Sequence, residues 1–310
     1  MIINRILNRL RVYYNIYKHK QVKTSYGNDN PDKVFYIIGV DYKTEGLFAI
    51  VKNTLVHIQY AVEKGYIPVV DMQHFTSQFS KLTNGNVWEL FFKQPMGYAL
   101  EDIKTSKNII LSKNITNWGS RSIFPNIVDD CNTPRRMYMS DLYKKYIIPN
   151  AKTHDYIESK YKKIIGCKKN VLGLLCRGTD YTQKRPKGHP VQPDFEQIVT
   201  KVDEVVKLYG CEYIYVATED KSLIESLKTK YGNKILEIGQ KRFGDIKVDF
   251  ISDLDIKNDD LIQLNMDYYA SLVLLSRCRH FVGGRTAGTI GVSLMNTNFE
   301  SFFSWDLGKY

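Results

Sequence analysis

The segment Val171-Leu172-Gly173-Leu174-Leu175-Cys176-Arg177-Gly178-Thr179-Asp180-Tyr181 decides the fold class. Its apolar beginning predicts a short strand that is buried on both faces, as in a parallel sheet. Ligands of open α/β sheets bind beyond the carboxyl ends of such strands, which is where Arg177 and Asp180 stand. Arginine can bind a diphosphate through paired hydrogen bonds, and Gly178 lets the backbone turn close to a ligand. An arginine–aspartate pair that only fastens the loop explains these residues equally well.

The same alternation of strand, loop and helix recurs on both sides of this segment. In the second half the pattern predicts strands at 171–176, 212–217, 234–238 and 280–283, and helices at 193–209, 221–231, 260–278 and 287–295. In the first half it predicts a strand at 34–40, a helix at 47–63 and a strand at 67–70. Short connections between such elements indicate parallel βαβ units. Each half is therefore expected to form a Rossmann-like α/β domain.

The length of 310 residues also favours two domains. We place an N-terminal domain at 34–165 and a C-terminal domain at 166–310. Residues 1–24 precede them and carry apolar side chains at helical spacing with Arg5, Arg9 and Arg11 between them. This pattern predicts a basic amphipathic helix that lies on an anionic membrane, or one that packs on the protein's own core. Residues 24–33 have the composition of a linker.

Charge and cysteine content limit the classes of partner and site. The formal net charge of +11 points to anionic partners, namely nucleotide diphosphates, lipid headgroups or nucleic acid. The five cysteines are scattered without a CxxC pair, which indicates neither a zinc site nor a disulfide framework and fits a reducing compartment. No stretch of 18 uninterrupted apolar residues is present to span a membrane.

Two further groups of polar residues follow predicted strands of the second half. Glu219 and Asp220 could accept hydrogen bonds from a ribose or a base, although Asp220 before a helix is also an ordinary capping residue. After strand 280–283, a Gly/Thr-rich turn starts a helix whose N–H groups and positive end could receive a phosphate. The candidates there are Arg285, Thr286, Ala287, Gly288 and Thr289. His189 lies in a loop expected to fold back toward Arg177, although a lone loop histidine is more often solvated.

The loop after the first predicted strand carries Asp41, Glu45 and Gly46, again at the carboxyl edge where ligand sites form. No aspartate cluster stands at a strand end of the first half to hold a metal ion. A metal-independent site, in which an arginine and a helix end neutralise phosphate, is therefore expected.

The segment from Leu174 to Pro190 resembles the nucleotide-binding loop of the GDP-fucose-dependent α1,6- and protein O-fucosyltransferase superfamily. That loop reads His-x-Arg-Arg-Thr-Asp and is followed, after a gap of the same length, by Phe-His-Pro. Arg177, Asp180 and His189 match family residues, and Gly178 stands in place of the second arginine. Residues 216–222 and 275–288 are similar to two later family segments, so that the resemblance covers most of residues 34–297.

The resemblance implies a GT-B fold, in which two Rossmann-like domains face each other and the C-terminal one holds the donor nucleotide. It also implies inverting transfer without a metal ion, with Arg177 on the donor diphosphate. The acceptor is expected mostly against the N-terminal domain, where Asp41, Glu45 and Gly46 are the candidates to bind it. Asp180 is the first candidate for the catalytic base of such a transfer, and Asp41 or Glu45 the second. The expected function is transfer of a sugar, fucose from GDP-fucose, onto a cell-surface glycan or a lipid-linked intermediate of polysaccharide biosynthesis. No cofactor is expected beyond this donor. The expected location is the cytoplasm, at the inner face of the membrane if the N-terminal helix binds there.

Three alternatives stay open at this point. A transferase could use another nucleotide sugar, because the residues that would read guanine differ most from the family. A non-catalytic nucleic-acid-binding protein would account for the net charge, but the basic residues are spread along the chain and no nucleic-acid partner is expected. The third alternative is a glycan-binding protein that descends from an inactive transferase.

Overall fold

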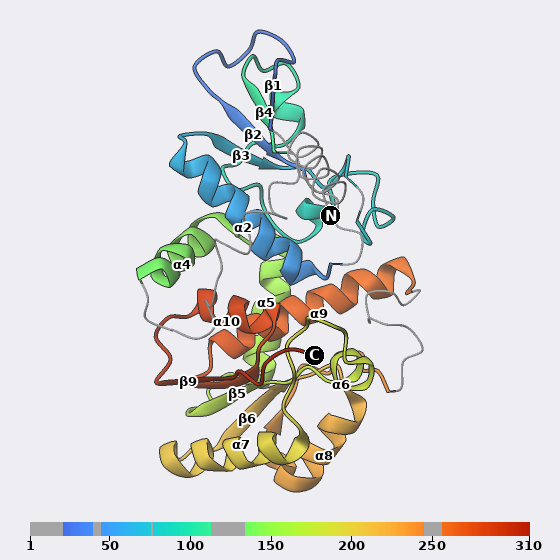
Figure 1. Cartoon of the computed structure of the whole chain (residues 1–310), viewed down its shortest axis with the longest axis vertical. Helices are drawn as coiled ribbons and strands as arrows, with labels where there is room; N and C mark the ends of the chain where they lie inside the picture. Colours follow the sequence, from blue (N-terminus) through green and yellow to red (C-terminus); the bar gives the residue numbers. More distant parts are fainter. Residues whose placement is uncertain (1–20, 40–44, 76, 113–133, 245–255) are drawn as a thin grey trace, which may run out of the picture. The chain divides into compact units, whose positions relative to one another are not determined.

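The computed structural model describes residues 21–39, 45–75, 77–112, 134–244 and 256–310 (Figure 1). The chain forms two compact units. Unit 1 comprises Met1–Glu45, Asn53–Pro125 and Lys145–Ile148, and unit 2 comprises Gly46–Lys52, Asn126–Lys144 and Pro149–Tyr310. Neither unit is continuous along the sequence, because Gly46–Lys52 and Asn126–Lys144 belong to unit 2 and interrupt unit 1.

Unit 1 is built on a mixed four-stranded sheet in the order β1-β4-β2-β3. Its strands are β1 (Val22–Thr24), β2 (Phe35–Ile38), β3 (Ile67–Val70) and β4 (Ile109–Leu111). Strand β2 is parallel to both β3 and β4, and helix α2 (Leu47–Glu63) stands between β2 and β3 in the chain. Two short 3-10 helices, η1 (Val87–Leu90) and η2 (Glu101–Ile103), complete the described elements. The predicted strand–helix–strand unit is thus present.

The beginning of the chain differs from the expectation. Residues 1–20 of the expected helix over 1–24 lie outside the described residues, and Val22–Thr24 form strand β1, antiparallel to β4. The segment with linker composition is fixed on unit 1, since the Tyr26 N–H donates to Ser106 O at 3.0 Å and the Asp29 N–H to Thr105 O at 2.9 Å. Composition alone did not reveal these partners, because they come from about 80 residues further along the chain.

Unit 2 is built on a fully parallel five-stranded sheet in the order β7-β6-β5-β8-β9. Its strands are β5 (Val171–Leu175), β6 (Tyr213–Ala217), β7 (Ile235–Leu236), β8 (His280–Gly284) and β9 (Ser301–Trp305). The helices are α4 (Pro134–Tyr146), α5 (Ala151–Ile164), α6 (Thr179–Lys184), α7 (Phe195–Tyr209), α8 (Lys221–Tyr231), α9 (Asn258–Ser276) and α10 (Ala287–Met295), with a 3-10 turn η3 (Gly232–Lys234). All residues of β5 are buried, as its apolar sequence predicts.

Helices cover both faces of this sheet (Figure 1). Apolar side chains of α7 and α8 form one buried cluster with β5, β6 and β8, and α9 packs against the opposite face, where Leu275 and Cys278 approach Gly173. The α/β prediction is therefore confirmed. Strand β9 and the short helix α6 were not predicted, and helix α7 begins at Phe195 rather than Pro193, because Asp194 forms the capping box.

The order of the strands creates a switch point beside β5. From β5 the chain adds β6 and then β7 on one side, and after α9 it adds β8 and β9 on the other side. In sheets with this strand order, the loops that follow the two strands beside the switch point leave in opposite directions at the carboxyl edge of the sheet. This edge is where ligands of open parallel sheets bind.

Two expectations from composition concern membrane-spanning segments and the cysteines. In the described ranges no helix combines the length and the apolar character needed to cross a bilayer. Cys176, Cys211 and Cys278 are buried side chains of the core, as their apolar surroundings suggest, whereas Cys167 is exposed.

Candidate functional site

Three neighbouring strands of unit 2 deliver the expected polar residues to one edge. In the parallel register Leu175 lies beside Ala217 on one side and beside Gly283 on the other. The residues that follow these three strand ends, including Arg177 and Glu219, therefore meet at the carboxyl edge on either side of the switch point. The sequence predicted this convergence, and the contacts below show what each side chain does there.

Arg177 is held by an anion and by an aromatic ring. Its Nε lies 3.6 Å from Oε1 of Glu219, and its guanidinium carbon lies 5.1 Å from the centre of the Tyr181 ring. Glu219 Oε1 also accepts the Gly178 N–H at 2.9 Å. The Arg177 side chain keeps 29% of its surface exposed, so that a fixed positive charge remains accessible at the edge. Glu219 supports the arginine loop, and its expected contact with a ribose stays a prediction.

Asp220 acts at the start of α8 in the way its capping interpretation predicts. Its Oδ1 accepts the Leu223 N–H at 3.0 Å and the Ser222 hydroxyl at 2.8 Å. The rest of the carboxylate lies against Gly178, where a Cβ atom would stand 2.3 Å from Asp220 Oδ2. Asp220 thus caps α8 and shapes the loop, and its direct contact with the donor stays a prediction.

His189 packs into the site instead of standing in solvent. Its Nδ1 lies 3.1 Å from the Tyr181 hydroxyl, and the two rings meet edge to face with centroids 5.3 Å apart. The loop is fixed by residues near the end of the chain, because the Gly188 N–H donates to Tyr310 O and the Tyr310 N–H to His189 O. Arg177, Tyr181 and His189 therefore form one connected cluster.

The turn after β8 is organised by its own hydroxyl groups. Thr286 caps α10, since its Oγ1 accepts the Thr289 N–H at 3.2 Å. The Thr289 side chain is fully buried and its hydroxyl donates to Gly284 O, so it does not face a ligand as expected. The N–H groups of Ala287 and Gly288, in the first turn of the helix, are the ones left to receive a phosphate there.

Arg285 has a partner at the end of the neighbouring strand. Its Nη1 lies 2.8 Å from Oδ2 of Asp306, the residue that follows β9. Its carbonyl accepts a hydrogen bond from Gln192 Nε2 at 3.3 Å, which ties the turn after β8 to the loop that carries His189. To bind the donor nucleotide as expected, Arg285 would therefore have to share or give up its ion pair with Asp306.

Tyr268, on α9, is a site residue that the sequence reasoning missed. A Cβ atom at Gly288 would lie 3.0 Å from its hydroxyl, which places this group beside the first turn of α10. Burial raises the pKa of Tyr268 to about 12, the nearby Arg177 guanidinium acts in the opposite direction, and Glu219 and Tyr181 add to the rise. A neutral phenol donor thus stands beside the first turn of α10, near enough to Arg177 for the guanidinium to act on its pKa. In the sequence Tyr268 lies in an apolar helical stretch, a pattern that indicates core packing.

Burial also excludes Cys176 as a nucleophile at this edge. It raises the pKa of the Cys176 thiol, and the charges of Glu219 and Asp220 raise it further. Because the thiolate is the reactive form, Cys176 is a packing residue and not a covalent catalyst.

Several expected residues are not placed at this edge. Asp41 and the side chain of Asp180 lie outside the described residues, although Asp180 itself belongs to helix α6. Glu45 belongs to unit 1, and its carbonyl accepts a hydrogen bond from Gln78 Nε2 at 2.6 Å. The Gly46 carbonyl accepts the Ala49 and Ile50 N–H groups and so begins α2.

Comparison with known proteins supports the fold. No family model and no curated protein sequence matches this chain. Among solved structures, the fucosyltransferase NodZ from Bradyrhizobium matches with a TM-score of 0.50 and 13% identity, over 85% of this chain and 94% of that one. This chain has a fucosyltransferase fold. A structure of the NodZ alpha-1,6-fucosyltransferase co-crystallised with GDP matches equally well, with 14% identity over 85% of this chain and 93% of that one. A mutant of Arabidopsis thaliana FUT1 in complex with GDP matches with a TM-score of 0.51 and 10% identity, over 87% of this chain and 70% of that one.

The fucosyltransferase fold makes the departure at Gly178 informative. The resembling loop carries a second arginine at this position, and here the approach of Asp220 leaves no room for any side chain. Position 178 therefore cannot carry a guanidinium next to that of Arg177.

Proposed function

We propose that the protein is an inverting glycosyltransferase that moves fucose from GDP-fucose to a hydroxyl group of a glycan or of a lipid-linked glycan intermediate. The observation that carries the proposal is the position of Arg177 and of the start of α10, which follow the adjacent strands β5 and β8 on the two sides of the switch point. Tyr268 stands in electrostatic contact with Arg177 and beside the first turn of α10. The GDP present in two of the similar structures supports a guanine nucleotide as the leaving group.

The chemistry of transfer requires stabilisation of the departing diphosphate. When the bond between sugar C1 and the phosphate oxygen breaks, negative charge grows on the β-phosphate. Arg177, the Tyr268 hydroxyl and the N–H groups of Ala287 and Gly288 are donors that are already fixed in place, which is the arrangement that lowers such a barrier. These groups supply the positive potential that a metal ion would otherwise give, so the transfer is proposed to be metal-independent.

The acceptor is proposed to bind unit 1 in a GT-B organisation, with the donor in unit 2. Its hydroxyl attacks C1 from the face opposite the leaving group, which inverts the configuration at that carbon. The proton must pass to a base, for which the sequence offers Asp180, Asp41 and Glu45. Residues 1–20 are proposed to bring the enzyme to an anionic membrane surface on the cytoplasmic side, where lipid-linked acceptors are found.

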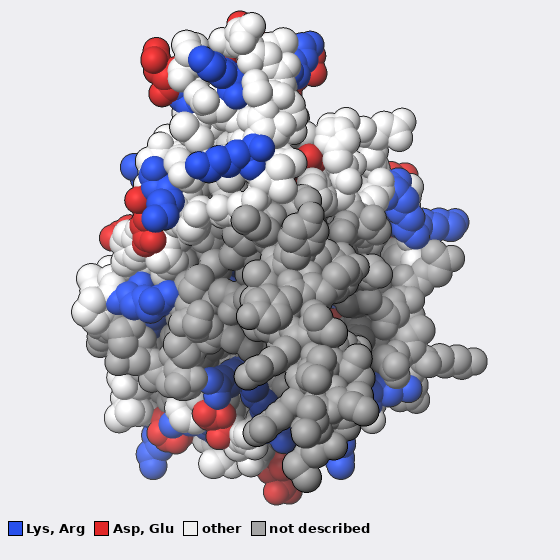
Figure 2. Space-filling view, turned by 45° about the horizontal axis from the view of Figure 1, so that its top comes forward, with Lys and Arg blue, Asp and Glu red and all other residues white. Residues whose placement is uncertain are grey.

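On the face shown in Figure 2, the basic side chains of the described residues do not favour the nucleic-acid alternative. Figure 2 shows that Lys and Arg side chains of the described residues form separate groups on the face in view, several of them beside Asp or Glu. Sequence-independent binding of nucleic acid needs a continuous basic stripe along the backbone path. A nucleotide needs only a local cation, such as the partly exposed guanidinium of Arg177.

Calorimetric titration of the full chain with GDP, UDP and single-stranded RNA tests the proposal. We expect micromolar binding of GDP, weaker binding of UDP, and a loss of about 10- to 100-fold for GDP in Arg177→Ala, the worth of one charged hydrogen-bonded group. Arg279→Ala is the matched control, because this exposed arginine pairs with Glu300 just before β8, at the opposite edge of the sheet. Equal GDP binding by Arg177→Ala, or tight and salt-dependent RNA binding in its place, would overturn the proposal.

A further inference from the structure

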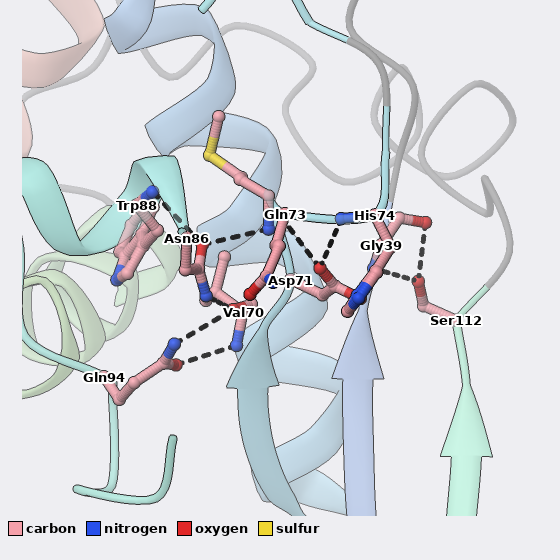
Figure 3. A network of polar contacts seen from close by, with 10 residues as sticks. Gly39, Val70, Asp71, Gln73, His74, Asn86, Trp88, Gln94 and Ser112 are labelled. Carbon is pink, nitrogen blue, oxygen red and sulfur yellow. Dashed lines mark hydrogen bonds and ion pairs between the residues drawn. The ribbon is translucent and has the colours of Figure 1, made fainter. Parts of the chain in front are cut away.

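A second polar cluster lies at the carboxyl edge of the sheet in unit 1 (Figure 3). Gly39, Asp71 and Ser112 follow the parallel strands β2, β3 and β4, so that they meet at one edge. The Ser112 hydroxyl accepts the Gly39 N–H at 3.1 Å and ties the ends of β2 and β4 together. Asp71, at the end of β3, is the charged member of the group.

Asp71 holds the imidazole of His74. One carboxylate oxygen, Oδ1, accepts the N–H groups of Gln73 and His74 at 3.0 Å each, and the other, Oδ2, lies 3.0 Å from His74 Nδ1. The Asp71 side chain is only 7% exposed, whereas that of His74 is 65% exposed. Because a carboxylate accepts and does not donate, Nδ1 carries the proton and the lone pair of the neutral imidazole stands on Nε2. The turn alone would need only Oδ1, so the second oxygen serves to orient the histidine.

Two amide side chains fix the backbone on both sides of Asp71. Gln94 brackets Val70, accepting its N–H and donating to its carbonyl, both at 2.9 Å. The buried Asn86 donates to the same carbonyl at 2.6 Å and accepts the Met72 N–H at 3.1 Å. The dyad of Asp71 and His74 therefore stands on a clamped strand end, as Figure 3 shows, and its geometry is set before any ligand arrives.

The dyad lines a cavity of about 510 Å³, a size ordinary for small-ligand sites. Tyr26 contributes a half-exposed ring to the same lining, and burial followed by the charge of Asp71 raises the pKa of its hydroxyl, which keeps it a neutral donor. The other charged lining residues are Glu89, Glu101 and Lys104. Three carboxylates against one ammonium disfavour a phosphate, whereas an aromatic face with carboxylates and amides suits the hydroxyl groups of a sugar.

We infer that this cavity binds a carbohydrate acceptor and that His74, oriented by Asp71, is the general base that takes the proton of the attacking hydroxyl, in place of the carboxylates that the sequence offers for this role. The role of His74 as a base depends on the proposed function, whereas the binding of carbohydrate to the cavity does not. In the step, the hydroxyl oxygen forms a bond to C1 of the donor sugar while the C1–phosphate oxygen bond breaks. The electron pair of the broken bond stays on the departing GDP. The hydroxyl proton moves to Nε2 of His74 and then to solvent. The products are the glycoside, GDP and one proton.

Histidine NMR on the full chain tests the cavity without any donor. The probes are the methyl glycosides of glucose, galactose, mannose and N-acetylglucosamine, titrated into protein labelled at histidine Cε1, with His74 assigned through His74→Gln. We expect a saturable shift of the His74 resonance and none for His154, a comparably exposed histidine on α5 that lies beside Asp155. No saturable shift with any glycoside, or equal shifts at both histidines, overturns the site.

Turnover of GDP-fucose with the glycoside that binds tests the role of His74. His74→Gln and Asp71→Asn should lower kcat, the former by about 100-fold or more, with the KM for GDP-fucose within about twofold. His154→Gln should leave both constants unchanged, and added imidazole should restore part of the kcat of His74→Gly. A wild-type kcat in His74→Gln, with activity lost in Asp180→Asn, overturns the assignment. Glycoside binding by a wild-type protein that does not consume GDP-fucose refutes the proposed donor and supports the cavity.

Discussion

Gly178 and Asp220 approach so closely that only a glycine fits between the arginine loop and the start of α8. A Cβ atom at position 178 would lie 2.3 Å from Oδ2 and 2.4 Å from Cβ of Asp220. The φ angle of Gly178 is −107°, so the requirement is for space and not for a left-handed backbone. Asp220 cannot turn away without giving up its capping bonds to Ser222 and Leu223.

This contact predicts the effect of Gly178→Ala. We expect a loss of about 1–3 kcal/mol in the free energy of unfolding, together with weaker GDP binding, because the loop with Arg177 must move. Adding Asp220→Gly should recover part of both losses, since glycine is a tolerable N-cap. Gly244→Ala, where a Cβ meets nothing within 4 Å, is the control for urea unfolding and calorimetry. Additive losses in the double variant would contradict the steric explanation.

Tyr268→Phe separates function from stability. The Tyr268 hydroxyl makes no hydrogen bond within the described part of the chain, so its removal should leave Tm unchanged. With GDP-fucose as donor, kcat should fall by about 10- to 100-fold if the hydroxyl stabilises the departing diphosphate. Tyr209→Phe, at the end of α7, is the matched control. A lower Tm with unchanged kcat would mean that Tyr268 is only a packing residue.

His57, in α2, predicts a loss of stability in acid. Burial lowers the pKa of His57 from 6.5 to about 3. Between these values the unfolded chain binds a proton that the folded one does not, so this stabilising contribution is complete above pH 6.5 and is lost as the pH falls toward 3. The slope is at most about 1.4 kcal/mol per pH unit. Urea unfolding at several pH values should show a shallower dependence for His57→Gln, and the wild-type dependence for His154→Gln. Equal slopes for all three proteins would refute the prediction.

The buried contact of Arg136 with the last turn of α10 predicts a loss of stability when this arginine is replaced. Its side chain is fully buried and donates through Nε and Nη2 to the Ser293 carbonyl, at 3.0 and 2.7 Å, in the last turn of that helix. Arg136→Met should cost about 1–3 kcal/mol, because a buried carbonyl loses its partner. The adjacent and exposed Arg135→Met should be neutral. Thermal unfolding measures both variants, and equal Tm values would show that the guanidinium contributes nothing to stability.

Local patterns were sufficient for the elements that carry their own signals. Helix 221–231 was predicted with its observed bounds, because it begins at a capping aspartate and ends at a glycine. Strand β5 was recognised from an unbroken apolar run, which only burial on both faces explains. Strand β1 was not recognised because it has three residues and pairs with β4, which lies far along the chain. Strand β9 was not recognised because serines interrupt its apolar residues.

The sequence by itself determined that this chain is an α/β protein and that Arg177, Glu219 and the turn at 285–289 end up at one sheet edge, because parallel strands end together. Only the tertiary structure decided which atoms those residues meet. Glu219 turned out to support Arg177, Thr289 to be buried, and Tyr268 and His74 to stand at sites that no spacing revealed. The physical reason is that strand direction follows from local apolar patterns, whereas side-chain contacts depend on how segments far apart in the chain pack together.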